Sequence, residues 1–265
     1  MTEYFYAAIL GLVQGIAEFL PISSSGHLVI IGELLHVYGG TSIPSESATM
    51  SVALHFGTLM SILVVYRQEL RSLLQDRRML ALVVVATVPV GVVGLLLKDH
   101  VESVFSTALL AGVALMVTAA LLLLGRWLQN QQNATEQLST FAAAVIGVFQ
   151  AIAVIPGISR SGSTITAGIA CGVSREASAR FSFLIAIPAI GGAALVTAND
   201  LFSENTTSQA SWPPILLGTV IAFVVGVVSL SFLLRIVTAD RLHWFAGYCL
   251  TVGMLTVAWQ LSIGV

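Results

Sequence analysis

Six apolar runs of about twenty residues constrain the fold of this chain more than any other feature. Each run is bounded by charged or polar residues, and as a helix it is long enough to cross a hydrocarbon core, which takes roughly 20 residues. Only 9% of the 265 residues are charged, against roughly 25% in soluble domains. We therefore expect an all-α polytopic membrane protein with six transmembrane helices, at about 50–66, 79–97, 104–126, 180–198, 214–236 and 244–263.

Four shorter apolar segments remain, and they form two pairs. Segments 4–20 and 26–38 flank a polar, turn-forming stretch, and segments 141–155 and 162–171 flank a second one. A broken helix at membrane depth is tolerated only where protein or a water-filled cavity surrounds it. We therefore expect two re-entrant helical hairpins whose broken tips meet inside the bundle.

The two tips are copies of one another. Residues 11–26 align with residues 147–162 at an offset of 136, with eight identities in 16 positions. The same offset carries the second and third predicted spans onto the last two. Because one hairpin and three crossings leave the second copy on the opposite side, we expect a single membrane domain, 1–265, built from inverted-topology repeats at 1–130 and 137–265.

Cations in the connecting segments predict an orientation, because Lys and Arg concentrate in cytoplasmic loops. Lys98 alone falls on one predicted face, whereas Arg160 lies in the second tip and belongs to neither. We expect both termini, and the acidic loop with Asp200 and Glu204, to be extracytoplasmic. The cations on the predicted cytoplasmic face are Arg67, Arg71, Arg77, Arg78, Arg126, Arg175, Arg180, Arg235 and Arg241.

The tip residues suit an anion. Residues 23–26 and 159–162 each run into the start of a short helix, where free amides and the helix dipole attract phosphate. The serine hydroxyls add hydrogen-bond donors, and glycine lets the backbone approach a bound phosphate closely. The planar guanidinium of Arg160 can donate two hydrogen bonds to phosphate oxygens. Ordinary N-capping explains either group of serines alone, but the duplication and the buried arginine favour an anion site. The predicted substrate-binding residues are Gln14, Ser23, Ser25, Gly26, Ser159, Ser161 and Gly162.

Glu18 and Gln14 lie one helical turn apart, just before the first tip, and therefore share a face. An acidic group inside a membrane segment is costly, which makes it a functional candidate. A carboxylate beside a phosphate site can hold a divalent cation or act as a base. The alternative is a structural ion pair between Glu18 and Arg160.

Two histidines are candidates of unequal weight. His27 directly follows the first tip and is suited to act as nucleophile, general acid or general base, although such a residue can also be a hydrogen-bonded structural one. His55 lies in a predicted span, where its side chain can line the cavity, but no neighbouring motif supports a role, and we leave it out of the predicted site.

Residues 14–27 and 156–162 closely resemble the two signatures of the undecaprenyl-diphosphate phosphatase family, the bacitracin-resistance proteins of bacteria. The resemblance extends over essentially the full length. It implies an inner-membrane hydrolase that converts undecaprenyl diphosphate, the C55 lipid carrier, to its monophosphate and inorganic phosphate, so that the carrier is recycled for peptidoglycan synthesis. It also implies a divalent cation, commonly magnesium or calcium.

Taken together, the residues and the resemblance predict that Glu18, Ser24, His27 and Arg160 are catalytic, with Glu18 also the metal ligand. Gln14 stands where many members of the family have glutamate. Because glutamine cannot ionise, we expect metal binding or general-base catalysis to depend mainly on Glu18. The nucleophile is left open between Ser24 and His27, and a homodimer is also left open. We expect the pocket to open to the extracytoplasmic side.

A different class of function shares this architecture. Inverted repeats with broken helices are typical of transporters, so a lipid-phosphate transporter or flippase is the alternative to an enzyme. The gathering of a carboxylate, a hydroxyl and an imidazole at one tip favours the enzyme. A net charge of −2 provides no basic patch and argues against nucleic-acid binding.

Overall fold

The computed structural model describes residues 2–39, 48–105, 107–129, 134–203, 212–238 and 241–263. Within this part the chain is helical, and its single β contact is an isolated bridge between Thr135 and Val173. The helices are α1 (Thr2–Ala17), α2 (Ser24–Gly39), α3 (Ala48–Val65), α4 (Arg67–Leu73), α5 (Arg77–Phe105), α6 (Ala108–Gln129), α7 (Thr140–Ile152), α8 (Arg160–Ala170), α9 (Arg175–Ser203), α10 (Trp212–Thr238) and α11 (His243–Ser262).

Five of the described helices, α5, α6, α9, α10 and α11, are long and apolar enough to cross a membrane. A sixth crossing is added if α3 and α4 count as one broken span, since they are bent by 77° at a short break. Tyr66 lies at this break with φ −93° and ψ 18°, outside helical geometry. The protein is thus an all-helical, multi-pass membrane protein, and every predicted span corresponds to a helix. The short helix α4 was not predicted, because its polar sequence is no apolar run.

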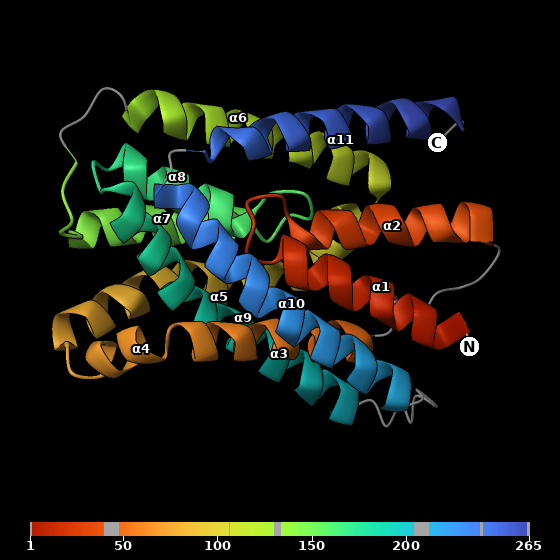
Figure 1. Ribbon diagram of the computed structural model, residues 1–265, viewed down its shortest axis with the longest axis horizontal. Helices are drawn as coiled ribbons and strands as arrows, with labels where there is room; N and C mark the ends of the chain where they lie inside the picture. Colours follow the sequence, from red (N-terminus) through yellow and green to blue (C-terminus); the bar gives the residue numbers. More distant parts are fainter. Residues whose placement is uncertain are drawn as a thin grey trace.

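Two helices run further than predicted. Helix α5 continues to Phe105 and α9 to Ser203, so Lys98 and Asp200 lie within helices and not in loops. Neither polar extension contains proline or glycine to end the helix. The side chains of Lys98 and Asp200, and all of Glu204, lie outside the described residues. Helix α4, which carries two of the predicted cytoplasmic arginines, lies at the opposite end of the molecule from both termini (Figure 1).

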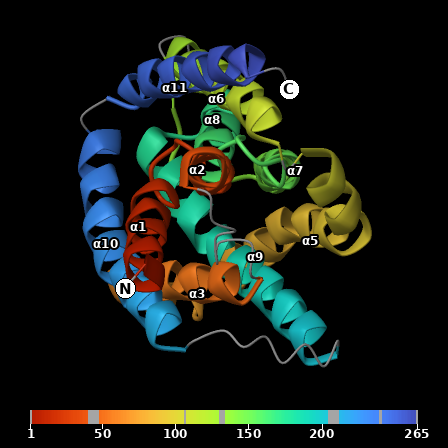
Figure 2. The same ribbon diagram turned by 90° about the vertical axis from the view of Figure 1, so that its right-hand side faces the viewer.

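Helices from the first and second halves of the chain pack against one another. Helix α1 packs on α10, α7 on α5, and α6 on α11 (Figure 2). Glycines make these approaches close: a Cβ on Gly147 would lie 2.7 Å from the Ala86 carbonyl oxygen, and Gly11, its equivalent in the first half, lies against the Gly218 carbonyl. The intimate contacts therefore join the halves and bring both tips to the centre.

The backbone of both tips is buried and hydrogen-bonded by side chains. The Gly157 amide donates to Ser23 Oγ over 3.1 Å, and the Ser159 amide donates to Thr118 Oγ1 of α6 over 2.9 Å. An unpaired amide inside a membrane costs several kcal/mol. These contacts let the chain leave helical geometry inside the protein at both tips.

Candidate active site

The two tips touch across the middle of the molecule. A Cβ on Gly26 would lie 2.7 Å from Gly157 Cα, and Gly157 itself has φ +99°, a conformation suited to glycine. The Ser161 hydroxyl donates to the Leu20 carbonyl over 3.4 Å. This close approach brings the start of α2 and the start of α8 to one place.

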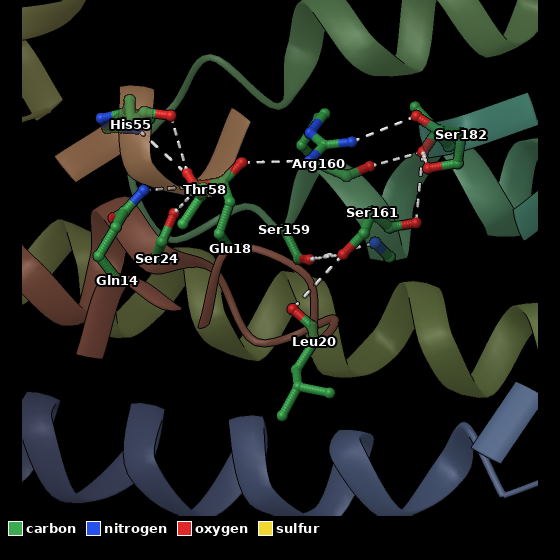
Figure 3. A network of polar contacts seen from close by, with 12 residues as sticks. Gln14, Glu18, Leu20, Ser24, His55, Thr58, Ser159, Arg160, Ser161 and Ser182 are labelled. Carbon is green, nitrogen blue, oxygen red and sulfur yellow. Dashed lines mark hydrogen bonds and ion pairs between the residues drawn. The ribbon is translucent and has the colours of Figure 1, made fainter. Parts of the chain in front are cut away.

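Glu18 is the centre of the resulting polar cluster (Figure 3). Arg160 Nη2 lies 3.1 Å from Oε1, and the Ser24 hydroxyl donates to Oε2 over 2.7 Å. Gln14 Nε2 also donates to Oε2, over 3.1 Å. The carboxylate, only 7% exposed, is therefore held by an arginine from one tip and a serine from the other.

Ser24 and Arg160 occupy equivalent positions in the two copies, since 160 is 24 plus the offset of 136. Each is the first residue of its short helix. The duplicated motif thus presents a hydroxyl from one copy and a guanidinium from the other. Arg160 is further held by its Nη1, which donates to the Ser182 carbonyl of α9 over 3.2 Å, so its second nitrogen points at the carboxylate.

The N-cap alternative holds for the first serine of each tip. Ser23 Oγ accepts from the Gly26 amide over 3.3 Å, and Ser159 Oγ accepts from the Gly162 amide over 3.1 Å. Capping and anion binding are compatible here, because each cap takes the third amide of its helix. The first two amides of a helix have no partner within it, so in each tip they can donate to a ligand.

A cavity of about 490 Å³ adjoins the cluster. Its polar end is formed by both tips, including Glu18, Ser24 and Arg160, and its long wall by apolar or small residues of α5 and α9. A cavity with one charged end and an apolar wall suits an amphiphilic ligand. Of the predicted binding residues, Ser23, Ser25 and Ser159 line the cavity; those behind it are Gln14, Gly26, Ser161 and Gly162.

The two histidines lie on different sides of the first tip. His55 of α3 lines the cavity, with Nε2 3.9 Å from Glu18 Oε2. Its Nδ1 lies 2.8 Å from the Ser51 carbonyl, which can only accept, so Nδ1 carries a proton and Nε2 faces the site. No sequence motif near His55 predicts that it lines the cavity, because only the packing of α3 brings the side chain to this place.

His27, in contrast, does not line the cavity. Its Nδ1 lies 2.8 Å from the Ser23 carbonyl and its Nε2 lies 2.8 Å from the Tyr248 hydroxyl of α11. The two rings are stacked, with centroids 5.6 Å apart and planes 10° apart. The structure therefore separates His27 from Glu18 and Arg160, with which the sequence grouped it.

Comparison with known proteins adds an independent observation. Residues 7–255 match the family model described as "Bacitracin resistance protein BacA". The chain belongs to this family. It is 45% identical to the "Undecaprenyl-diphosphatase" of Rhodopirellula baltica over 98% of this chain and 100% of that one, and 39% identical to that of Halothermothrix orenii over 96% and 97%. It is 35% identical to that of Mycobacterium ulcerans, over 94% of this chain and 93% of the relative.

The divalent cation implied by the BacA resemblance does not fit a site built from protein ligands alone. Among the described residues, no group of three or more His, Cys, Asp or Glu side chains lies close enough to hold a metal. The Glu18 carboxylate already accepts from Arg160, Ser24 and Gln14. Mg²⁺ bound through one carboxylate takes its remaining oxygen ligands from water and from substrate phosphates, so Glu18 would hold a cation only together with the phosphates of a bound substrate.

Proposed function

We propose that this chain is an undecaprenyl-diphosphate phosphatase, which hydrolyses the C55 lipid diphosphate to the lipid monophosphate and inorganic phosphate. The names of its relatives support this activity. The observation that carries it is the meeting of Ser24, Glu18 and Arg160 at the polar end of an apolar cavity. These groups provide a nucleophile, a base and an anion-binding fork within hydrogen-bond reach of one another.

Ser24 is the proposed nucleophile. Its hydroxyl attacks the terminal phosphorus as its proton passes to Glu18 Oε2, 2.7 Å away. A bond forms between Ser24 Oγ and phosphorus, and the bond from phosphorus to the bridging oxygen breaks, releasing the lipid monophosphate with that electron pair. The position of His27 behind the first tip supports serine over histidine in this role.

Hydrolysis of the phosphoserine completes the cycle. The proton that Glu18 took from Ser24 first passes to the released lipid monophosphate, which restores the carboxylate. A water then attacks the phosphorus and loses a proton to Glu18, the Oγ–phosphorus bond breaks, and Glu18 passes that proton to Ser24 Oγ. His55, 3.9 Å from the same carboxylate oxygen, lies where it can orient this water. The products are inorganic phosphate and the original side chains, so atoms and protons balance.

Arg160 and the helix amides bind the phosphates. Without a ligand, the guanidinium pairs with Glu18, and this ion pair keeps two buried charges satisfied. An entering terminal phosphate competes for the same guanidinium nitrogen and frees the carboxylate to accept a proton. The ion pair that the sequence offered as a structural alternative is, in this proposal, the resting form of the site.

The wall formed by α5 and α9 is the proposed path for the first isoprene units. A Cβ added at Gly91, Gly94 or Gly192 would meet no atom within 4 Å, which leaves open space along this wall. The apolar wall and the charged tips then match the two ends of a lipid diphosphate. The rest of the tail, far longer than the cavity, extends into the bilayer.

We further infer six crossings and two re-entrant hairpins in inverted repeats, with both termini extracytoplasmic and the pocket opening to that side of a bacterial plasma membrane. The equivalence of α1 with α7 and of α2 with α8 at one sequence offset supports the repeat. The asymmetric arginines support the orientation. Labelling a cysteine at position 25 with a membrane-impermeant reagent tests it, and exclusive reactivity from the cytoplasm would contradict it.

Phosphate release from undecaprenyl diphosphate by purified protein in detergent tests the enzymatic function. Detergent micelles have no compartments, so a transporter without chemistry gives no phosphate. Ser24→Ala should lose activity, whereas Ser231→Ala, which removes a hydroxyl that donates to the Val227 carbonyl of its own helix α10, should match the wild type. Near-normal release by Ser24→Ala would refute the proposed nucleophile.

A further inference from the structure

Ser23 has an unusual backbone conformation that its role as a cap does not require. Its φ is +67°, and no other non-glycine residue in the described part of the chain has a positive φ. Its equivalent in the second tip, Ser159, caps α8 through the same kind of bond with φ −72° and ψ 120°. A left-handed serine is sterically disfavoured, so contacts outside the cap must hold it.

His27 supplies such a contact from one helical turn further along α2. The Ser23 carbonyl accepts both the His27 amide, over 3.2 Å, and His27 Nδ1, over 2.8 Å. In the second tip, the equivalent position is Ser163, whose hydroxyl has no hydrogen-bond partner among the described residues. The extra bond is therefore specific to the tip with the left-handed serine.

Tyr248 fixes the imidazole in turn. A carbonyl can only accept, so Nδ1 carries the proton and Nε2 of the neutral ring accepts from the Tyr248 hydroxyl. The stacked rings add a second restraint on the same side chain. Helix α11 thus reaches the first tip through one tyrosine and one histidine.

We propose that His27 and Tyr248 are positioning residues, which hold Ser23 in its left-handed conformation and thereby aim the Ser24 hydroxyl at Glu18. Ser24 follows Ser23 directly, so a change in the Ser23 backbone redirects the nucleophile and its 2.7 Å bond to Glu18. The inference rests on the proposed function, in which Ser24 attacks phosphorus. Neither residue touches the substrate.

Variants at position 27 separate positioning from chemistry. His27→Ala removes the bond to the Ser23 carbonyl, and we expect kcat to fall about 100-fold with little change in KM, since small misplacements of a reacting group have that effect. His27→Asn keeps an N–H donor near the place of Nδ1 but cannot accept or give a proton as imidazole does. It should restore kcat to within about tenfold of the wild type.

Tyr248→Phe tests the second link. Loss of the hydroxyl should lower kcat about tenfold in the wild type but have no further effect in the His27→Asn background, because asparagine does not reach Tyr248. The matched control is Tyr38→Phe. Tyr38 also joins α2 to α11, through a hydroxyl 3.2 Å from Trp259 Nε1, but outside the tips, and its loss should leave kcat unchanged.

Each contrary result overturns the inference. A His27→Asn variant that is folded by thermal unfolding but as inactive as His27→Ala would show that the imidazole itself reacts. An equal effect of Tyr248→Phe in both backgrounds would show that the two residues act separately. Ser24→Ala is measured in parallel, and its loss of phosphate release upholds the proposed function. If His27→Asn then fails to restore activity, the result refutes only the positioning role of His27 and Tyr248. Wild-type protein that releases no phosphate would refute both.

Discussion

Replacing Arg160 by alanine has two separable consequences, one for stability and one for catalysis. Glu18 Oε1 loses its 3.1 Å partner, and the carboxylate, 7% exposed, keeps only the hydrogen bonds from Ser24 and Gln14 to Oε2. Breaking a buried ion pair costs roughly 3–5 kcal/mol. We expect about 3 kcal/mol in the free energy of unfolding, the low end of that range, because the cavity lets water reach the carboxylate.

The effect on phosphate release should be larger. Removing one preorganised donor to a developing oxyanion costs about 10²–10³ in rate, and a charged fork on a phosphoryl group more. Arg160→Ala should therefore lower kcat/KM at least about 10³-fold, or about 4 kcal/mol of transition-state stabilisation. Arg160→Lys keeps the charge but cannot reach both Glu18 and the Ser182 carbonyl with one nitrogen, so its activity should be intermediate.

A double variant separates the two effects. Glu18→Gln removes the charge that Arg160→Ala leaves unpaired. The double variant should therefore regain most of the decrease in thermal unfolding temperature that Arg160→Ala causes in detergent, while it remains inactive. The assay is phosphate release from undecaprenyl diphosphate beside a thermal unfolding scan of each variant. Phosphate release by Arg160→Ala within tenfold of the wild type would refute the role given to this ion pair.

Three further outcomes follow from the packing and the cavity. Gly94→Leu should raise KM for the C55 substrate several-fold with little change in kcat, by filling the space along α5; Gly247→Leu, which enters equally open space on α11 away from the cavity, should not. Gly253→Ala should lower the unfolding midpoint by an amount equivalent to about 1–3 kcal/mol, since its Cβ would lie 2.6 Å from the Gly112 carbonyl oxygen. Lipid-free protein should show no tight Mg²⁺ binding by calorimetry, because Glu18 is already committed to three donors.

The helices and the meeting of the tips could be predicted from sequence because their causes are local or repeated. Apolar runs set the spans, and the duplication at offset 136 required two similar breaks to be buried together. The sites of the histidines could not be predicted in the same way. His55 approaches Glu18 only because α3 packs beside both α1 and α9. The residues near His55 in sequence give no indication of that packing.

His27 shows the opposite difficulty. It is close to the tip in sequence, but one helical turn after Ser23 its side chain lies over the preceding carbonyl and turns toward α11. Because His27 is close to the tip in sequence, it was predicted to react with the substrate. In the structure its imidazole instead donates to the Ser23 carbonyl. The bend at Tyr66 could not be predicted from sequence either, because apolar residues continue up to the break.

The difference between Ser24 and Arg160 gives the central cavity a polarity that two identical tips would lack. Two like hydroxyls would leave a bound anion without a permanent cation, and two like guanidiniums would repel each other across the same carboxylate. In the proposed mechanism, one of each gives the headgroup a single favoured orientation, with the terminal phosphate facing the Ser24 oxygen and the lipid monophosphate on the side of the tail. A pseudosymmetric scaffold thereby catalyses a reaction that distinguishes the two ends of its substrate.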